Sequence, residues 1–255
     1  MTITFETKVW ENDWELILKT SRLKDLVERC NHPLDHRVLY INNIKNPAEV
    51  ESHAQKWIDE GVIDQYVHVH EHAQAALDFF NLSKEKLGKG YYYSIAELVS
   101  IYLTKTKYLL HFSSDAIPEK NIKTPWLKLG LDLLEAKPEV KVYNLTWNRR
   151  YKEAINEALE QDQDFYYGYG FSDQMYLVRT ADFRAPIYEE FHEASKRYPQ
   201  YGGELFEKRV DSWMRNNHCV RATYRHASYL HQNFSKHDLI KKIAVALNYP
   251  TLLSK

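Results

Sequence analysis

The sequence predicts an α/β domain with a mostly parallel central sheet and helices on both faces. Short apolar, β-branched segments alternate with helical patterns along the first half of the chain, as they do in parallel sheets. The 255 residues are enough for one core, and 44% apolar with 27% charged residues is typical of a chain that folds. The chain has no internal repeat or low-complexity linker, so we expect one domain over residues 1–255.

The first half of the chain consists of strand–helix units. The helix after the second strand is the best marked, with Asn46 as its cap, Pro47 at its first position and Gly61 as its stop. Hydrophobic periodicity gives the other limits. Strands are expected over Thr2–Val9, Arg37–Ile44, Val62–His70 and Lys107–Ser113, and helices over Asp13–Cys30, Pro47–Glu60 and Ser94–Thr104.

The second half has a different pattern, with an aromatic and glycine-rich tract, FYYGYGFSDQMYLVRT, in its middle. Helices and strands alternate less regularly around this tract. Helices are expected over Trp126–Glu135, Tyr151–Glu160, Glu204–Arg215 and Asp238–Leu247, and strands over Val140–Leu145 and Val220–Tyr224.

The composition excludes some classes of protein. The 34 basic and 35 acidic side chains are intermixed, so we expect no nucleic-acid partner. No window reaches about eighteen apolar residues, so no transmembrane segment is expected. Cys30 and Cys219 show no metal-type spacing and are too few for a secreted disulfide scaffold, which favours a cytoplasmic location. The 19 tyrosines and 6 tryptophans fit stacking on a sugar-like ligand and a large wet interface equally well.

The end of the fourth expected strand is the strongest functional signal. Its apolar residues give way abruptly to Ser113, Ser114 and Asp115. Ligands of open α/β sheets bind outside the carboxyl ends of the strands, so Asp115 is a candidate binding residue. The alternative is that Asp115 only caps the turn before Ile117 and Pro118.

Taken together, several segments resemble the GT-A glycosyltransferases, most closely the family-two-like group, over nearly the whole chain. The segments are ITFETKVWEND, INN, GYYYSIAELVSIYLTKTKYLLHFSSDAIP, GGELFEKR and YLH. The resemblance implies a single GT-A (Rossmann-like) domain that transfers a sugar from a nucleoside-diphosphate-sugar donor to a saccharide or other hydroxyl-bearing acceptor. Residues 1–115 would then form the nucleotide-sugar-binding half and residues 116–255 the acceptor-side half.

The resemblance also implies a divalent cation, Mn²⁺ or Mg²⁺, at the strand end. The related enzymes carry two aspartates around one residue there, and Ser113 stands in place of the first. The implied metal ligands are Asp115 and a late histidine, His231, with His226 as the fallback. One carboxylate is few for a hard cation, so metal dependence stays open, and Arg209, Arg221 and Arg225 are the alternative counter-charges for the diphosphate.

By the same resemblance, the nucleoside would contact the ends of the first two strands, at Thr7, Glu11, Asn42 and Asn43. Asn43 fits a left-handed turn equally well. Ser94 is expected either near the diphosphate at a helix N-terminus or as an N-cap only.

For catalysis, the resemblance implies an inverting reaction with Glu204 as the general base, and Asp173 is the alternative base. Glu204 can also serve only to stabilise the first helical turn, with Glu207 and Asp211 farther along the same face. We expect the tract Tyr166–Phe171, including Tyr169, to line the acceptor cleft, with core packing as the alternative.

Two other functions compete with glycosyl transfer. The reduced Ser113-Ser114-Asp115 motif also fits a non-catalytic nucleotide-sugar-binding or scaffolding domain. A nucleotidyltransferase would show a glycine-rich basic loop after the first strand, which TKVWENDWE lacks. A metal site built from His68, His70 and His72 on one strand face is a minor alternative to exposed histidines.

Overall fold

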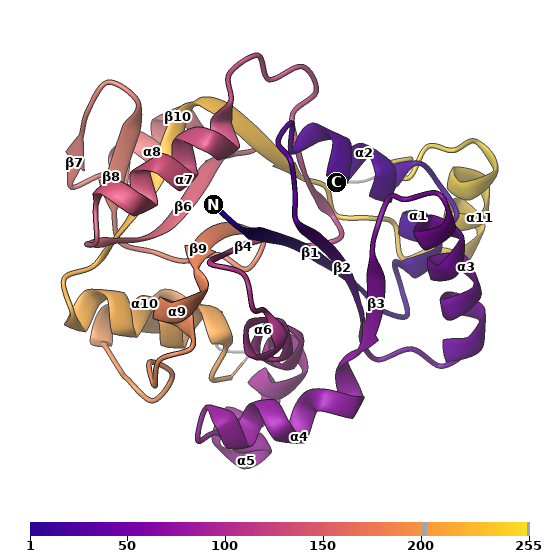
Figure 1. The fold of residues 1–255 in the computed structure, drawn as a ribbon, viewed down its shortest axis with the longest axis horizontal. Coiled ribbons are helices and arrows are strands. Elements are labelled where there is room, and N and C mark those ends of the chain that lie inside the picture. Colours follow the sequence, from indigo (N-terminus) through magenta and orange to yellow (C-terminus); the bar gives the residue numbers. More distant parts are fainter. Residues whose placement is uncertain (200–202, 254–255) are drawn as a thin grey trace.

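The computed structural model describes residues 1–199 and 203–253, which form one ten-stranded sheet with helices on both faces (Figure 1). The expected α/β class is confirmed. Strand β1 lies between β2 and β4 and is parallel to both, and β2 pairs in parallel with β3. Beyond β4 the sheet is mixed, because β9 runs antiparallel to β4 and β6, whereas β10 runs parallel to β6.

The strands lie in the order β3-β2-β1-β4-β9-β6-β10-β8-β7, and β5 pairs with β10. Their bounds are β1 Ile3–Val9, β2 His36–Ile41, β3 Gln65–His68, β4 Tyr108–Phe112, β5 Ala116–Pro118, β6 Val140–Trp147, β7 Glu160–Gln161, β8 Phe165–Gly168, β9 Met175–Arg179 and β10 Val220–His231.

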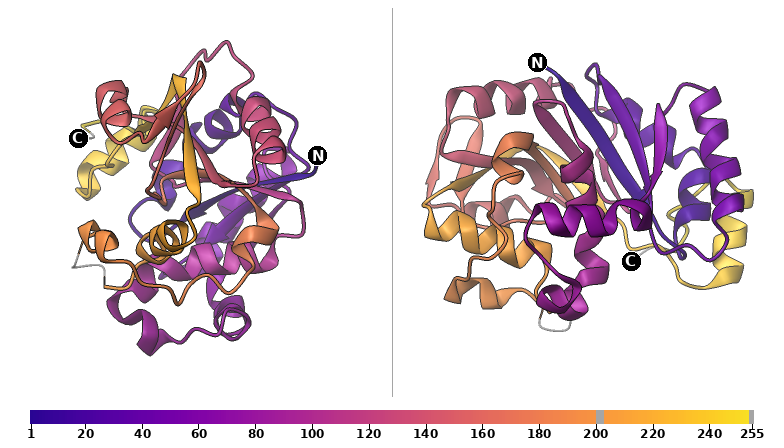
Figure 2. Two further views of the ribbon diagram at one scale, coloured as in Figure 1. Left: turned by 90° about the vertical axis from the view of Figure 1, so that its left-hand side faces the viewer. Right: turned by 60° about the horizontal axis from the view of Figure 1, so that its bottom comes forward.

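The helices form two layers, and Figure 2 shows them from two further sides. Alternate residues of the strands face opposite layers, as Leu109 and Leu110 of β4 do. One layer contains α4 (Val69–Phe79), α6 (Tyr91–Leu103), α9 (Thr180–Phe183) and α10 (Phe206–Asn216). The other contains α1 (Trp14–Leu18), α2 (Arg22–Arg29), α3 (Pro47–Asp59) and α7 (Trp126–Ala136). The remaining helices are α5 (Lys84–Leu87), η1 (Gly88–Gly90), α8 (Tyr151–Asn156), η2 (Glu193–Arg197) and α11 (Asp238–Ala246).

Two expected elements are wrong. The helix expected over Asp13–Cys30 is two helices, and Thr20 at the break donates its side-chain hydroxyl to the Leu16 carbonyl oxygen. The strand expected over Val62–His70 ends at His68, and the chain continues directly into α4. His70 and His72 therefore lie on a helix, where residues two apart do not share a face.

Other boundaries move by a few residues. Helix α6 begins at Tyr91 instead of Ser94, and α10 begins at Phe206, so Glu204 precedes the helix. Strand β10 continues past Tyr224 to His231. Gly202, the first glycine of the GGELFEKR segment, lies outside the described residues. Across residues 1–199 and 203–253, the helices lack the length and apolar character needed to cross a membrane.

Strand β1 carries a polar row on the face opposite Ile3 and Phe5. Thr4 bonds to the Thr106 hydroxyl at 2.8 Å, Glu6 contacts His111, and Lys8 forms an ion pair with Glu97 of α6. The Glu97 side chain is fully buried, whereas Lys8 is partly exposed. Charge pairing thus joins the central strand to the helix that precedes β4.

We expect Lys8→Met to destabilise the fold by roughly 3–5 kcal/mol, because it leaves the buried Glu97 carboxylate without a counter-charge. The double variant Lys8→Met/Glu97→Leu should recover most of that loss. Urea unfolding of both variants measures the difference. Lys24→Met, which removes a lysine from an exposed pair with Glu28, is the control and should cost under about 1 kcal/mol. A double variant as unstable as Lys8→Met would contradict the pairing argument.

Candidate functional site

The two predicted metal ligands, Asp115 and His231, lie side by side. Asp115 follows β4 in a short turn, and His231 ends β10. The His231 Nε2 atom lies 3.1 Å from Asp115 Oδ2, and Ser113 Oγ donates to Asp115 Oδ1 at 2.8 Å. The backbone continues this link, because the Gln232 amide donates to the Asp115 carbonyl oxygen at 2.8 Å. Residues 116 positions apart thus form one local cluster.

The contact between Asp115 and His231 shifts the pKa of both side chains. Burial opposes ionisation of Asp115, but the hydrogen bond and charge of His231, helped by Ser113 and Arg22, hold its pKa below the ordinary value. Burial favours the neutral form of His231, yet the Asp115 carboxylate raises the His231 pKa above its ordinary value. The pair therefore favours an ionised carboxylate beside an imidazolium.

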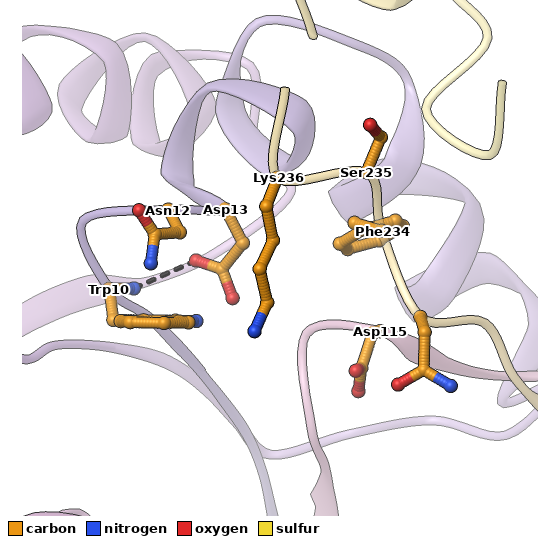
Figure 3. Close-up of a pocket in the computed structure, with 8 residues that line it drawn as sticks. Trp10, Asn12, Asp13, Asp115, Phe234, Ser235 and Lys236 are labelled. Atoms are coloured by element: carbon orange, nitrogen blue, oxygen red, sulfur yellow. Dashed lines mark hydrogen bonds between the residues drawn. The ribbon is translucent and has the colours of Figure 1, made fainter. Parts of the chain in front are cut away.

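Beside Asp115 lies a pocket of about 240 Å³ at the carboxyl ends of β1 and β4 (Figure 3). Lys236 points into it between Asp13 and Asp115, and the Trp10 ring lies along one side. Trp10 is 43% exposed, so a flat aromatic face is available to a ligand. The lining residues are Trp10, Asn12, Asp13, Asp115, Asn233, Phe234, Ser235 and Lys236.

Asp13 is a second carboxylate in this pocket. It accepts a hydrogen bond from the Trp10 amide at 2.8 Å and another from the Ser114 hydroxyl at 2.5 Å. Burial raises the pKa of Asp13 to about 7, the two hydrogen bonds oppose that rise, and the charge of Asp115 adds to it. Asp13 was not predicted as a pocket carboxylate, because in the sequence it was taken only as the first residue of a helix.

Arg22 fixes the two segments that meet at the pocket. Its side chain is buried; Nη1 donates to Gln232 Oε1 at 2.7 Å, and Nε donates to the Ser114 carbonyl oxygen at 3.4 Å. Its guanidinium carbon also lies 5.4 Å from the centre of the Phe234 ring. One buried cation thus connects the turn after β4 with the chain after β10.

Of the four residues expected to contact the nucleoside, one is buried in a strand and three lie in the loops after β1 and β2. Thr7 is fully buried within β1, so it does not line the pocket. Glu11 accepts from the Lys45 amide at 2.9 Å and thereby joins the loops after β1 and β2. The Asn42 amide donates to the Val9 carbonyl oxygen at 2.9 Å, and Asn43 has a φ of 50°, as expected for a left-handed turn residue.

Ser94 lies in neither expected place. It is fully buried inside α6, and its hydroxyl accepts a hydrogen bond from the Phe206 amide at 2.9 Å. It therefore supports the start of α10 instead of facing a diphosphate. Glu204 lies just before that start, and its carboxylate pairs with Lys208.

Asp173, the alternative base, belongs to a buried polar chain. The Glu6 carboxylate lies 2.6 Å from His111 Nδ1, and His111 Nε2 lies 2.6 Å from the Asp173 carbonyl oxygen. The Asp173 amide donates to Glu207 at 2.8 Å. Burial and the Asp173 charge raise the pKa of Glu207 well above its ordinary value. The next residue, Gln174, accepts a hydrogen bond from the Ser113 amide at 2.9 Å through its carbonyl oxygen, so Asp173 lies close to the turn that carries Asp115.

The aromatic tract divides between core and surface. Tyr166, Tyr167 and Phe171 are buried, so core packing accounts for these three rings. Tyr169 lies under the Arg215 guanidinium, 4.9 Å from ring centre to cation. Among the rings of the tract, Tyr169 is the one that is partly exposed.

The three arginines expected as alternative counter-charges do not line the pocket beside Asp115. Arg209 donates to the carbonyl oxygens of Tyr188 and Lys86, which is a structural role. Arg225 and the fallback histidine His226 contact the carbonyl oxygens of Asp162 and Gln163 near β8. Arg221 is the one that lies near the Gly170 region.

Solved structures with the same architecture are known. Glucosyl-3-phosphoglycerate synthase from Mycobacterium tuberculosis, with Mn²⁺, uridine diphosphate and glucosyl-3-phosphoglycerate, matches with a TM-score of 0.50 at 15% identity, over 98% of this chain and 80% of that chain. Its complex with Mg²⁺ and uridine diphosphate gives 0.51 at 16% identity, over 98% and 79%. The chain has the GT-A fold. No protein-family model matches the sequence, and a search of curated proteins finds no match.

In this GT-A fold, the Asp115–His231 pair lies at the carboxyl end of β4, beside the pocket. Within the described residues, no group of three or more histidine, cysteine, aspartate and glutamate side chains is arranged to hold a metal ion. Any cation here would need most of its ligands from a bound molecule and water.

The raised pKa of Glu207 makes the stability of the GT-A core depend on pH. Between the ordinary and the raised pKa, the folded state binds more protons than the unfolded state, so the free energy of unfolding falls as pH rises through that range. Glu207→Gln keeps the acceptor for the Asp173 amide and removes this effect. Urea unfolding at pH 5 and pH 8 should show the variant gaining stability relative to the parent as pH rises. Glu153→Gln, at an exposed position, is the control. Identical pH profiles for parent and Glu207→Gln would contradict the assignment.

Proposed function

We propose that this protein is a glycosyltransferase that moves a sugar from a nucleoside-diphosphate sugar to a saccharide or other hydroxyl-bearing acceptor. The observation that carries the proposal is the convergence of Asp115 and His231 beside a pocket at the carboxyl ends of β1 and β4. That edge is where open α/β sheets bind ligands. The similar M. tuberculosis enzyme carries uridine diphosphate with Mn²⁺ or Mg²⁺. In the same proposal, residues 1–115 serve the donor and residues 116–255 the acceptor.

The pocket residues suit the parts of such a donor. The exposed Trp10 ring offers a stacking face for a base, and the loops that Glu11, Asn42 and Asn43 form lie at the adjoining strand ends. Lys236 brings a positive charge into the pocket, where it can pair with a phosphate (Figure 3). Ser113 supports the proposed diphosphate contact indirectly, by orienting Asp115.

A divalent cation, Mn²⁺ or Mg²⁺, fits the site as a partner of the donor. Asp115 and His231 would hold it, since a carboxylate oxygen and an imidazole nitrogen lie 3.1 Å apart, and the diphosphate and water would complete its coordination. When bound, the cation supplies positive charge to the leaving diphosphate. To bind it, His231 must lose the proton that Asp115 favours, so cation and proton compete for this nitrogen.

We propose an inverting reaction in which Glu204 takes the proton from the attacking hydroxyl, with Asp173 as the alternative base. Glu204 lies before α10 in a loop where Gly203 approaches the Gly90 amide, at the N-terminal end of α6. Asp173 lies within the electrostatic range of His231. Asp173 precedes Gln174, whose carbonyl oxygen accepts a hydrogen bond from the Ser113 amide at the end of β4.

Donor binding can be tested by thermal unfolding with UDP, GDP, dTDP and CMP, each with and without Mn²⁺. A ligand at a hundred times its dissociation constant should stabilise the fold by about 2.7 kcal/mol. Asp115→Ala should abolish the Mn²⁺-dependent part, whereas Asp132→Ala, which removes an exposed carboxylate from α7, should not. Absence of stabilisation by all four nucleotides would refute the donor site.

The general base can be identified by comparing Glu204→Gln with Asp173→Asn. Loss of the base should lower turnover by roughly 10²–10⁴-fold and leave donor affinity unchanged. NMR of the product should show an inverted anomeric centre. Near-normal turnover in both variants, or retained configuration, would contradict the mechanism. Donor binding without transfer or hydrolysis would instead favour a non-catalytic sugar-nucleotide-binding domain.

A further inference from the structure

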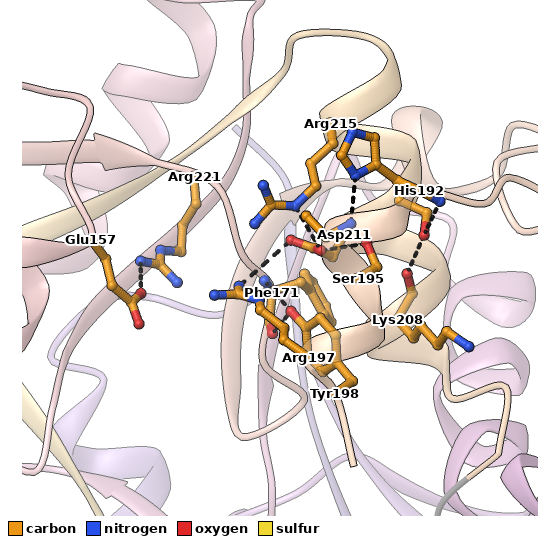
Figure 4. A network of polar contacts seen from close by, with 12 residues as sticks. Glu157, Phe171, His192, Ser195, Arg197, Tyr198, Lys208, Asp211, Arg215 and Arg221 are labelled. Carbon is orange, nitrogen blue, oxygen red and sulfur yellow. Dashed lines mark hydrogen bonds and ion pairs between the residues drawn. The ribbon is translucent and has the colours of Figure 1, made fainter. Parts of the chain in front are cut away.

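Three arginines from distant segments gather beside Gly170, and we call Arg197, Arg215 and Arg221 the arginine cluster. They come from η2, the end of α10 and the start of β10 (Figure 4). Figure 4 shows their guanidinium groups facing a common space. A Cβ atom at residue 170 would lie 2.6 Å from Arg197 Nη2 and 3.0 Å from Arg221 Nη1. Two cationic groups therefore approach one point that only a glycine leaves open.

Two carboxylates pair with the arginine cluster. The fully buried Asp211 lies 2.9 Å from Arg215 Nε and 3.6 Å from Arg197 Nη2. Glu157 Oε2 lies 3.1 Å from Arg221 Nη2. Three positive charges thus have two carboxylates, and the guanidinium groups of Arg197 and Arg221 approach each other beside Gly170. One positive charge of the cluster is therefore left for an anionic ligand to balance.

The hydrogen-bond pattern of Arg221 supports the same conclusion. Its side chain is only 8% exposed, and its buried Nε–H has no partner within the described part of the chain. A guanidinium carries five N–H donors, and a buried donor without an acceptor lowers stability. Stacking of Arg221 on Trp147 at 5.3 Å, and of Arg215 on Tyr169, holds the planar groups in place before any ligand arrives.

The cluster adjoins the proposed reaction centre. The Arg221 guanidinium lies 5.3 Å from the centre of the Trp147 ring, and Trp147 pairs with Tyr229 where β6 meets β10. The Tyr229 hydroxyl donates to Gln174 at 3.1 Å, and the Gln174 carbonyl oxygen accepts from the Ser113 amide at 2.9 Å. Gly170 also lies three residues before Asp173 in the chain.

We propose that the arginine cluster binds an anionic group of the acceptor, a phosphate or a carboxylate, and so orients the attacking hydroxyl. That the bound anion belongs to an acceptor rests on the proposed glycosyl transfer. The anion site itself rests on the arginine cluster alone. Planar guanidinium groups pair with both oxyanions through parallel hydrogen bonds, so both kinds of anion suit the site.

The test compares three acceptor probes that differ in charge: glycerol, glycerate and glycerol phosphate. Calorimetric titration in the presence of saturating UDP should show that at least one anionic probe binds about tenfold or more tightly than glycerol, as expected for a charged hydrogen bond. The stronger of the two anionic probes identifies phosphate or carboxylate as the preferred group. Arg197→Gln, at a partly exposed position, and Arg221→Gln should each abolish the preference and leave the dissociation constant of UDP unchanged.

Lys128→Gln, which removes one positive charge from an exposed position of α7, is the matched control and should keep the preference. A second arm uses inorganic phosphate alone, compared with chloride at equal ionic strength, and follows thermal unfolding. Stabilisation by phosphate that is lost in Arg197→Gln, without any binding of nucleoside diphosphates, would leave the anion site standing and refute the proposed function. Equal affinity for all three probes, or a preference unchanged in both arginine variants, would overturn the proposal.

Discussion

The contact between Glu6 and His111 inside the sheet is the constraint on which the geometry of the site depends. Both side chains are almost completely buried, so neither can exchange its partner for water. Because the Asp173 carbonyl oxygen can only accept, the His111 Nε2 atom must carry a hydrogen, and the other ring nitrogen shares its proton with Glu6. His111 also stacks on Tyr176 at 4.6 Å, which fixes the ring plane. One imidazole thus connects β1, β4 and the loop before β9.

The pocket is built from both ends of the chain. The turn after β4 contributes Asp115, and the segment after β10 returns to it through Gln232. Arg22, from the second helix, holds these two pieces against each other by bonding to both. The pocket therefore forms only after the last strand has joined the sheet. Local unfolding of the chain beyond His231 would remove the pocket and leave the central strands intact.

Much of the fold could be predicted because it depends on local patterns. The strand that ends before Ser113, and the helix that begins at Pro47, have clear apolar periodicity and clear terminal residues. The break near Thr20 was missed because no glycine or proline marks it. The first two residues of α4, Val69 and His70, were predicted as the end of a strand because Val67 and Val69 alternate with polar residues.

The site was less predictable because its contacts are distant in sequence. Asp115 could be found from its place after a buried strand, and His231 only from a family resemblance. Asp13 looks like an ordinary helix start in the sequence, and its role becomes visible only when the Ser114 hydroxyl is seen to reach it. The meeting of Arg197 with Arg221 depends on the backbone path at Gly170, which has a φ of 118°. No local sequence pattern predicts a contact between arginines from such distant segments.

Strand β10 carries Arg221 near its beginning and His231 at its end. It pairs with β6 on both sides of an irregularity between Tyr224 and Ser228, so the sheet fixes the separation of its two ends. In the proposed functions, this one strand would hold Arg221, which binds the anionic group of the acceptor, and His231, which lies at the donor site. A fixed distance between the two ends of β10 would favour acceptors in which the anionic group and the attacking hydroxyl are separated by a set number of bonds. An insertion between Tyr224 and Ser228 would then change the acceptor length that is preferred.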